Sequence, residues 1–106
     1  MIRAVIHFEL KPGCEQAFVA GFADVFRAVE KQKGYVTGEL CRRDTPEGTR
    51  YMVTTVWKTP GDYGAWQALH APENVDKATW MRSILDTLKS IPVGVPYRIL
   101  ETSHSR

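Results

Sequence analysis

The sequence is poor in cysteine, in long apolar runs and in blocks of like charge, and each shortage argues against a class of protein. Its two cysteines, Cys14 and Cys41, have no metal-binding spacing, and we expect free thiols rather than a disulfide. No apolar run approaches the roughly 20 residues that cross a membrane, and the N-terminus lacks a signal pattern. We therefore expect a cytoplasmic protein that has no membrane segment and no metal site.

The charges are nearly balanced and widely spread. Fourteen basic and twelve acidic residues give a net charge of +2, and the longest block of one sign is Arg42-Arg43. Nucleic acids and anionic membranes attract much stronger basic patches, so we expect neither as a partner. The sequence also lacks a phosphate-binding loop, an HExxH motif, a paired-carboxylate site and a Ser/His/Asp set, which argues against kinases, zinc proteases and hydrolases.

The chain contains enough apolar material for one compact domain. Hydrophobic residues make up 43% of its 106 positions. No internal repeat, low-complexity segment or linker divides the sequence. We expect a single domain over residues 1–106.

The first half of the chain predicts a strand, a helix and a hairpin. Residues 1–10 alternate between apolar and mixed side chains, as a strand does. Apolar residues then recur at helical spacing over Phe18–Val29, and Gly34 suits the end of that helix. A β-hairpin follows over residues 34–57, with its loop at Asp44–Thr49.

The second half gives less regular signals. Thr59-Pro60-Gly61-Asp62 is predicted to be a turn, and a short helix follows Trp66 until Pro72 interrupts it. A second long helix is predicted over residues 73–90, and a last strand over residues 96–102.

The resulting order β-α-β-β-α-β is that of ferredoxin-like α+β folds, in which two helices cover one face of a four-stranded antiparallel sheet. Apolar residues such as Val5 and Val56 also point to the other face, which one helical layer cannot cover. We therefore predict a homodimer in which the uncovered faces meet. A monomer with one solvated sheet face is the alternative, because many antiparallel sheets have one.

Several landmarks give the chain a family resemblance. They are a helix that ends in Gly34-Tyr35, the hairpin segment Arg50-Tyr51-Met52-Val53, its close at Val56-Trp57, and the pairs Asp62-Tyr63 and Ala65-Trp66. In this pattern the sequence resembles the antibiotic biosynthesis monooxygenase superfamily of dimeric α+β barrels over nearly its whole length. The resemblance implies a dimer and one of two reactions, which are cofactor-independent oxidation of polycyclic aromatic polyketides to quinones and degradation of haem.

The haem-degrading members carry an Asn on the first strand, a Trp after the third strand and a His on the next helix. Trp66 falls at the position of that Trp, and His7 stands where the Asn is expected. His70 is the nearby candidate for an iron ligand, although Val75 occupies the expected place of the family's His. We therefore expect no cofactor and regard His70 as a residue at a helix end. Haem ligated by His70 is the alternative.

A cofactor-free oxygenase must deprotonate an electron-rich phenol and shield the phenolate from water while it reduces dioxygen. We predict that His7 accepts the proton, that Asn74 or Tyr51 holds the oxyanion, and that an aromatic slot encloses the ring. The predicted slot comprises Phe22, Tyr63, Trp66 and Trp80. Trp66 joins His7 and Asn74 as a catalytic candidate, and Tyr51 joins the slot as a substrate-binding residue. Ordinary core packing is the alternative for each ring, and it is favoured for Trp57 and Phe26.

Two functions without catalysis share this order of elements. RNA-recognition domains need a glycine-containing aromatic motif on a central strand, and Arg50-Tyr51-Met52-Val53 lacks those glycines. A dimer that carries a small ligand without changing it is the second such function. It is distinguished from an enzyme by whether the bound ligand is chemically altered.

Overall fold

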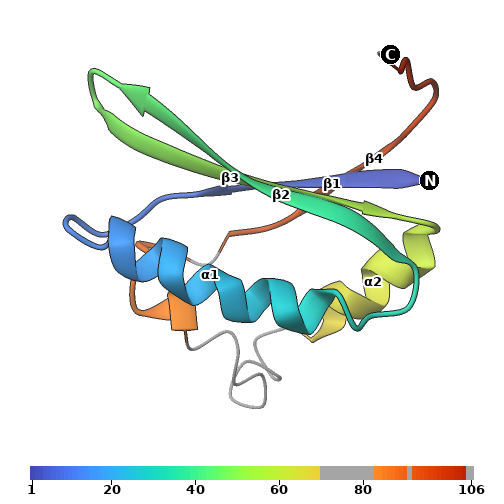
Figure 1. Ribbon diagram of the computed structural model, residues 1–106, viewed down its shortest axis with the longest axis horizontal. Helices are drawn as coiled ribbons and strands as arrows, with labels where there is room; N and C mark the ends of the chain where they lie inside the picture. Colours follow the sequence, from blue (N-terminus) through green and yellow to red (C-terminus); the bar gives the residue numbers. More distant parts are fainter. Residues whose placement is uncertain (70–82, 91, 105–106) are drawn as a thin grey trace.

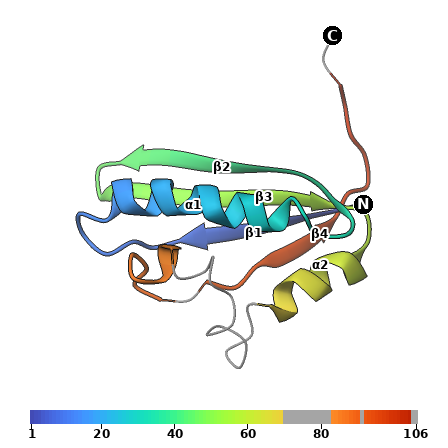
Figure 2. The same cartoon turned by 60° about the horizontal axis from the view of Figure 1, so that its bottom comes forward.

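A computed structural model describes residues 1–69, 83–90 and 92–104 and contains one four-stranded antiparallel sheet. The strand order is β2-β3-β1-β4, and α1 and α2 lie on the same face of the sheet (Figures 1 and 2). The element bounds are β1 Ile2–Phe8, α1 Glu15–Val29, β2 Tyr35–Thr45, β3 Gly48–Trp57, α2 Pro60–Ala68 and β4 Val95–Arg98. The predicted ferredoxin-like α+β class is therefore confirmed.

The alternation of β1 divides its side chains between two faces. Ile2, Ala4 and Phe8 are buried under the helices, whereas Arg3 and His7 are exposed on the other face. β1 pairs with β3 along its whole length and with β4 from Ile2 to Val5. Because β1 and β3 occupy the two central places in the sheet, their inward side chains form the floor of the core.

The β2–β3 hairpin turns more tightly than the predicted loop at residues 44–49. Both strands continue to the pair Thr45–Gly48, so only Pro46 and Glu47 lie outside the ladder. Gly48 has a φ of 127°, which only glycine adopts without strain, and the Thr45 hydroxyl donates a hydrogen bond of 2.6 Å to the Gly48 carbonyl. The turn therefore holds the two strands in one register.

Aromatic rings join α1 to the centre of the sheet. Phe18 lies 5.1 Å from Phe8 and 5.2 Å from Tyr51, measured between ring centroids. Phe22 lies 5.6 Å from Phe8 and also contacts Phe26 on its own helix. Such ring pairs contribute about 0.5–1.5 kcal/mol each beyond their buried area, so this cluster sets the position of α1.

The segment predicted to be a turn at residues 59–62 is instead the start of α2. The Thr59 hydroxyl accepts a hydrogen bond of 3.1 Å from the Asp62 amide, and Pro60 occupies the first helical position. Both are strong signals for a helix N-terminus. Tyr63 and Trp66 are consequently three residues apart on one helix, and both face the core.

The end of the chain differs from its predicted elements as well. The helix predicted over residues 73–90 falls largely outside the described residues, and its described part stops at Leu85. Leu88 forms an antiparallel bridge with Leu10, and the Lys11 amide donates a 2.8 Å hydrogen bond to the Thr87 carbonyl. This backbone pairing with the segment after β1 explains why the helix does not continue to residue 90.

The last strand is shorter than the predicted one. β4 spans Val95–Arg98, the Ile99 amide still donates a 3.0 Å hydrogen bond to the Met1 carbonyl, and residues 100–104 stretch away from the sheet (Figures 1 and 2). No helix within the described residues is long and apolar enough to cross a membrane. Cys14 and Cys41 are both free thiols.

Gly21 allows α1 to approach the segment at Ser83, and its replacement by alanine tests that contact. A Cβ at position 21 would collide with the Ser83 carbonyl, and the Ser83 hydroxyl also donates a 2.8 Å hydrogen bond to Asp24 of α1. Gly21→Ala should therefore lower the free energy of unfolding by about 1–3 kcal/mol in urea titrations followed by circular dichroism.

Gly64→Ala is the matched control for this substitution. Gly64 also lies inside a helix, but a Cβ there meets nothing within 4 Å. This variant should be neutral or gain up to about 1 kcal/mol of stability, because alanine favours helices more than glycine does. Equal effects of the two substitutions would contradict the close contact between α1 and Ser83.

Candidate functional site

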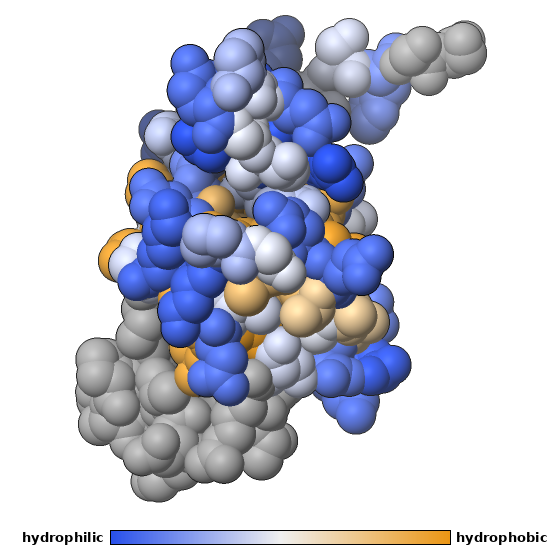
Figure 3. Space-filling view, turned by 90° about the vertical axis from the view of Figure 1, so that its left-hand side faces the viewer, coloured by the Kyte–Doolittle hydropathy of each residue, from blue (hydrophilic) through white to orange (hydrophobic). Residues whose placement is uncertain are grey.

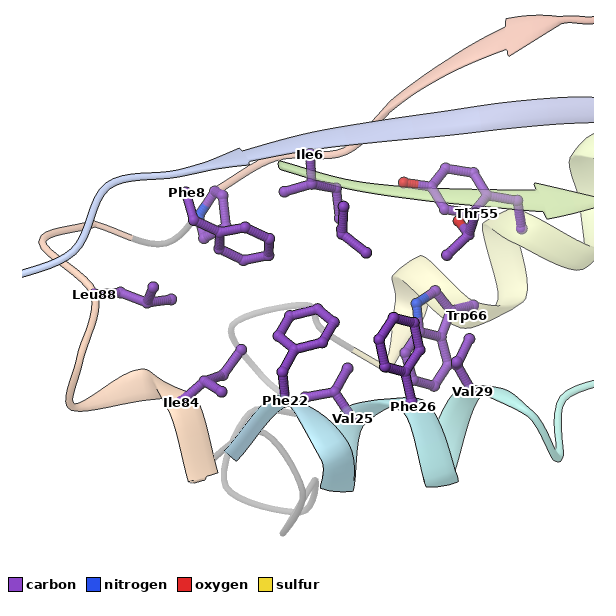
Figure 4. A pocket seen from close by; sticks show the side chains of 13 residues that line it. Ile6, Phe8, Phe22, Val25, Phe26, Val29, Thr55, Trp66, Ile84 and Leu88 are labelled. Carbon is purple, nitrogen blue, oxygen red and sulfur yellow. The ribbon is translucent and has the colours of Figure 1, made fainter. Parts of the chain in front are cut away.

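A cavity of about 90 Å³ lies between the sheet and the helices (Figure 4). Side chains from the sheet point down into it, and side chains from α1 point up towards them. α2 closes one end with Trp66, and Ile84 and Leu88 lie at the other. The described lining consists of Ile6, Phe8, Phe22, Val25, Phe26, Val29, Val53, Thr55, Tyr63, Trp66, Ile84, Leu88 and Pro92.

Three of the lining side chains carry a polar atom, namely Thr55, Tyr63 and Trp66. The Thr55 hydroxyl accepts a 2.8 Å hydrogen bond from the indole nitrogen of Trp57. A hydroxyl that accepts one hydrogen bond still has its own proton to donate. Thr55 can therefore donate to a ligand oxygen while Trp57 fixes its orientation.

Tyr63 connects the cavity to the start of β4. Its hydroxyl lies so close to Gly94 that a Cβ at that position would collide with it. The side-chain amide of Gln67, one helical turn further along α2, donates a 3.3 Å hydrogen bond to the Gly94 carbonyl. Burial raises the pKa of the Tyr63 phenol, and a hydrogen bond with Gln67 opposes this effect only in part. Tyr63 is thus a neutral hydrogen-bond donor at physiological pH.

The size of the cavity limits what it can hold. A cavity of about 90 Å³ is smaller than an engineered apolar cavity of roughly 150 Å³ that binds benzene. Pockets for drug-sized ligands have volumes of about 300–1,000 Å³. A single aromatic ring therefore enters only if lining side chains move apart, and a polycyclic ring system requires a larger rearrangement.

The structure brings three of the predicted site residues together. Phe22, Tyr63 and Trp66 line the cavity, from α1 and α2. Tyr51 is buried in the same core but packs against Phe18 and does not line the cavity. The predicted positions Asn74 and Trp80, and the alternative ligand His70, lie outside the described residues.

His7 lies on the opposite face of the sheet from Trp66. It is exposed and pairs across the ladder with Met52, whereas its neighbours Ile6 and Phe8 line the cavity. Because successive side chains of a strand point to opposite faces, His7 cannot reach a ligand in this cavity within one chain. The predicted combination of His7 as base and Trp66 as slot wall is therefore not brought together by the structure.

Several cavity residues were not predicted from the sequence. Thr55 lies on β3 between Val53 and Trp57, and all three side chains point to the same face in the alternation of the strand. The sequence pattern could therefore have predicted that Thr55 points inward. Gln67 and Gly94 are separated by 27 positions in the chain. No local signal identifies such a contact.

Comparison with known proteins gives one family and one fold. Residues 1–72 match the family model described as antibiotic biosynthesis monooxygenase. No curated protein sequence matches the chain. Solved structures match the chain over nearly its whole length. Their sequence identities are low, so these matches establish the fold and not the function.

Three of these structures illustrate the range of the fold. A mutant of MhuD with two manganese protoporphyrin IX molecules bound per active site is 20% identical, covers 99% of this chain and 100% of its own, and gives a TM-score of 0.74. SnoaB, a cofactor-independent oxygenase from Streptomyces nogalater, is 22% identical, with coverage of 95% and 94% and a TM-score of 0.66. A protein of unknown function from Nitrosomonas europaea is 17% identical, with coverage of 99% and 94% and a TM-score of 0.69.

The raised pKa of Tyr63 predicts a loss of stability in alkaline solution. The folded state favours the neutral phenol, so stability is fully present below the unfolded pKa of about 10 and falls as the pH rises above it. One such group changes the free energy of unfolding by at most about 1.4 kcal/mol per pH unit. Tyr63→Phe should therefore make the decline between pH 10 and 11 shallower, as measured by urea unfolding.

Tyr97→Phe is the control, because it removes an exposed phenol from β4. Its pH dependence of stability should follow that of the unmodified protein. An identical decline in the Tyr63→Phe variant would contradict the burial of the Tyr63 phenol as a cause. Tyr35, whose pKa burial also raises, remains in both variants and accounts for the residual decline.

Proposed function

Because the chain belongs to the antibiotic biosynthesis monooxygenase family, we propose that it is a cofactor-independent monooxygenase that oxidises a small aromatic phenol. The observation that supports this most directly is the cavity between the sheet and the helices, whose described lining is apolar except for three hydrogen-bonding side chains. An apolar enclosure excludes water from a reactive phenolate. The fold itself does not assign the reaction.

The reaction begins with transfer of the phenol proton to solvent, and the peroxide formed later takes one proton back to become the hydroperoxide. The resulting phenolate transfers an electron to dioxygen, and the two radicals combine to form a carbon–oxygen bond at the position para to the phenol oxygen. The hydroperoxide then loses water and leaves a quinone carbonyl, so one oxygen atom enters the product and the other leaves as water. No redox cofactor is consumed in this sequence.

The polar side chains of the cavity act on the phenolate oxygen. Tyr63 remains neutral because burial raises its pKa, so it donates a hydrogen bond to an anion. The Thr55 hydroxyl is a second hydrogen-bond donor in the same cavity, and Trp66 forms part of the wall. Donors that are already oriented stabilise charge without reorganisation during the reaction.

The described lining contains no carboxylate and no imidazole. The hydrogen-bond donors must therefore lower the pKa of the bound phenol, and acidic phenols should react faster than weakly acidic ones. The predicted roles of Asn74 and Trp80 in the same pocket stay predictions. His7 stays a catalytic prediction only for a ligand on the opposite sheet face.

Haem, the alternative cofactor, does not fit the described residues. The cavity volume of about 90 Å³ is well below the roughly 300 Å³ at which pockets for larger ligands begin. The described lining has no His, Cys or Met, and its one phenol, Tyr63, stays neutral because burial raises its pKa, whereas a tyrosine that ligates iron is deprotonated. We therefore derive no step through haem.

Oxygen uptake by the purified protein tests the proposed reaction. A panel of one-ring and two-ring phenols should be oxidised in the presence of a metal chelator and without added flavin or haem. Tyr63→Phe and Trp66→Phe should each lower kcat/KM by about tenfold or more, because each alters a group that contacts the substrate. Product analysis should show one oxygen atom from dioxygen in the quinone.

Tyr97→Phe is the matched control for the loss of a phenol hydroxyl, and its kcat/KM should be unchanged. Unaltered rates in both cavity variants would contradict the assigned pocket. Recovery of every bound phenol unchanged would make the protein a ligand carrier. A saturable complex with haemin that degrades under reductant would favour the haem-degrading alternative.

We also propose that the chain forms a homodimer through the sheet face that α1 and α2 leave uncovered (Figure 1). Val5, Thr54 and Val56 lie at the middle of this face, because Val5 pairs with Thr54 and Arg3 pairs with Val56. Thr54 and Val56 are already buried within the chain and Val5 is half-buried, so the area left for a second copy to cover comes mainly from Val5 and from β4. β4 adds Val95 and Tyr97, which are 48% and 60% exposed. A sheet face with this apolar centre gains free energy when a second copy covers it.

A lysine at the centre of this face should prevent dimer formation. Val5→Lys places an unpaired charge opposite Val95 and Thr54, so sedimentation at micromolar concentration should show the mass of one chain instead of two. Val19→Lys is the control, because Val19 is 47% exposed on the solvent side of α1. A monomer in the unmodified protein, or a dimer that survives Val5→Lys, would contradict the proposed interface.

A further inference from the structure

A second hollow lies on the other side of the sheet from the cavity, at the hairpin end. It is a groove of about 390 Å³ that shares only Phe8 with the described cavity lining. β1, β2 and β3 contribute its described lining, which consists of His7, Phe8, Glu9, Cys41, Arg42, Arg43, Arg50, Tyr51 and Met52. The surface at this end of the molecule is mostly hydrophilic (Figure 3).

Arg43 and Arg50 face each other in this groove as a pair of like charges. They are direct cross-strand partners of β2 and β3, and both are exposed. Like charges at directly opposite positions destabilise a sheet. Within residues 1–69, 83–90 and 92–104, neither guanidinium forms an ion pair. Among the described residues, the hydrogen bond that joins Arg50 to the Thr49 carbonyl at 3.5 Å is the one that either guanidinium donates.

The carboxylate of Asp44, next to Arg43 in the chain, is engaged by other side chains. Asp44 accepts a 3.0 Å hydrogen bond from Arg42 and a 3.2 Å hydrogen bond from the Thr49 hydroxyl. These two contacts lower the pKa of the Asp44 carboxyl. The hairpin therefore neutralises Arg42 and leaves the charges of Arg43 and Arg50 available.

The floor of the groove is apolar. Met52 pairs with His7 on one side and Cys41 on the other, and Met52 and Cys41 are half-buried. Glu9 is the one acidic side chain in the described lining. Arg42 pairs with the inward-facing Tyr51, so its side chain lies with Asp44 on the helix face of the sheet. On the groove face Arg43 and Arg50 stand against the single carboxylate of Glu9, which leaves one net positive charge and suits a ligand with a single negative charge.

We propose that this groove binds a small organic carboxylate, with its carboxylate between Arg43 and Arg50 and its apolar part on Met52 and Cys41. Guanidinium groups bind carboxylates through paired hydrogen bonds, and the binding of an anion removes the repulsion between the two cations. A volume of about 390 Å³ falls within the usual range for small-molecule pockets. The site is independent of the proposed oxygenase reaction, and in the proposed dimer it lies towards the polar end of the covered face.

Calorimetric titration of the full chain with sodium benzoate at low ionic strength tests this proposal. Benzoate should bind saturably with one site per chain, and its affinity should fall as salt is added. Benzyl alcohol, which keeps the ring and lacks the charge, should not compete for the site. Inorganic phosphate should bind at least tenfold more weakly than benzoate, because it has no apolar part to contact Met52.

The double variant Arg43→Gln/Arg50→Gln should weaken benzoate binding at least tenfold. The double variant Arg3→Gln/Arg98→Gln also removes two positive charges, but from β1 and β4, away from the groove. It should bind benzoate as tightly as the unmodified protein does. Circular dichroism should show the same fold in both, since all four side chains are exposed.

Three outcomes would overturn the proposal. The first is equal benzoate affinity in the two double variants. The second is phosphate binding as tight as that of benzoate, which would indicate a site for any anion. The third is the absence of benzoate binding together with dissociation of the dimer in Arg43→Gln/Arg50→Gln, which would assign the arginine pair to contact between copies of the chain.

Discussion

The structure depends on the packing of aromatic rings between α1 and the two central strands. Phe18 and Phe22 contact Phe8 of β1, and Phe18 also contacts Tyr51 of β3. These contacts fix α1 across the sheet at one end. At the other end Trp57 contacts Tyr63 and Trp66 of α2. The cavity lies between these two groups of rings, so both its position and its small volume follow from their packing.

The antiparallel sheet also separates the two candidate sites from each other. Alternation along β1 sends Ile6 and Phe8 to the cavity and His7 to the groove. The cavity is apolar and has few donors, whereas the groove has several charged side chains above an apolar floor. The two faces of one sheet thus carry an apolar site and a charged site.

Much of the fold was predictable because its signals are local. The alternation of residues 1–10 and the apolar stripe of Phe18–Val29 gave β1 and α1, and the hairpin followed from its Pro and Gly residues. The start of α2 was missed because Thr-Pro-Gly-Asp suits both a turn and a helix N-terminus. The early end of the last helix depends on the pairing of Leu88 with Leu10, which no local pattern reveals.

The candidate site was predicted only in part, for a similar reason. Phe22 was found because it lies in the apolar stripe of the first helix. Tyr63 and Trp66 were found because two rings follow the exit of the hairpin and Trp66 falls at a family position, although the helix that carries them was predicted to begin only after Trp66. His7 was assigned by analogy with a family position, although its place in the β1 alternation already pointed away from the helices. The contact of Gln67 with Gly94 was inaccessible, because only the folded chain brings these positions together.

Gly94 has a consequence for how this chain can change in evolution. The hydroxyl of Tyr63 occupies the space that any side chain at position 94 would need. A larger residue at 94 is therefore tolerated only after position 63 becomes smaller. Likewise, a tyrosine can return to position 63 only after position 94 is again a glycine. Divergence at these two sites is coupled, so the cavity acquires a new shape through paired substitutions in α2 and in the segment that leads into β4.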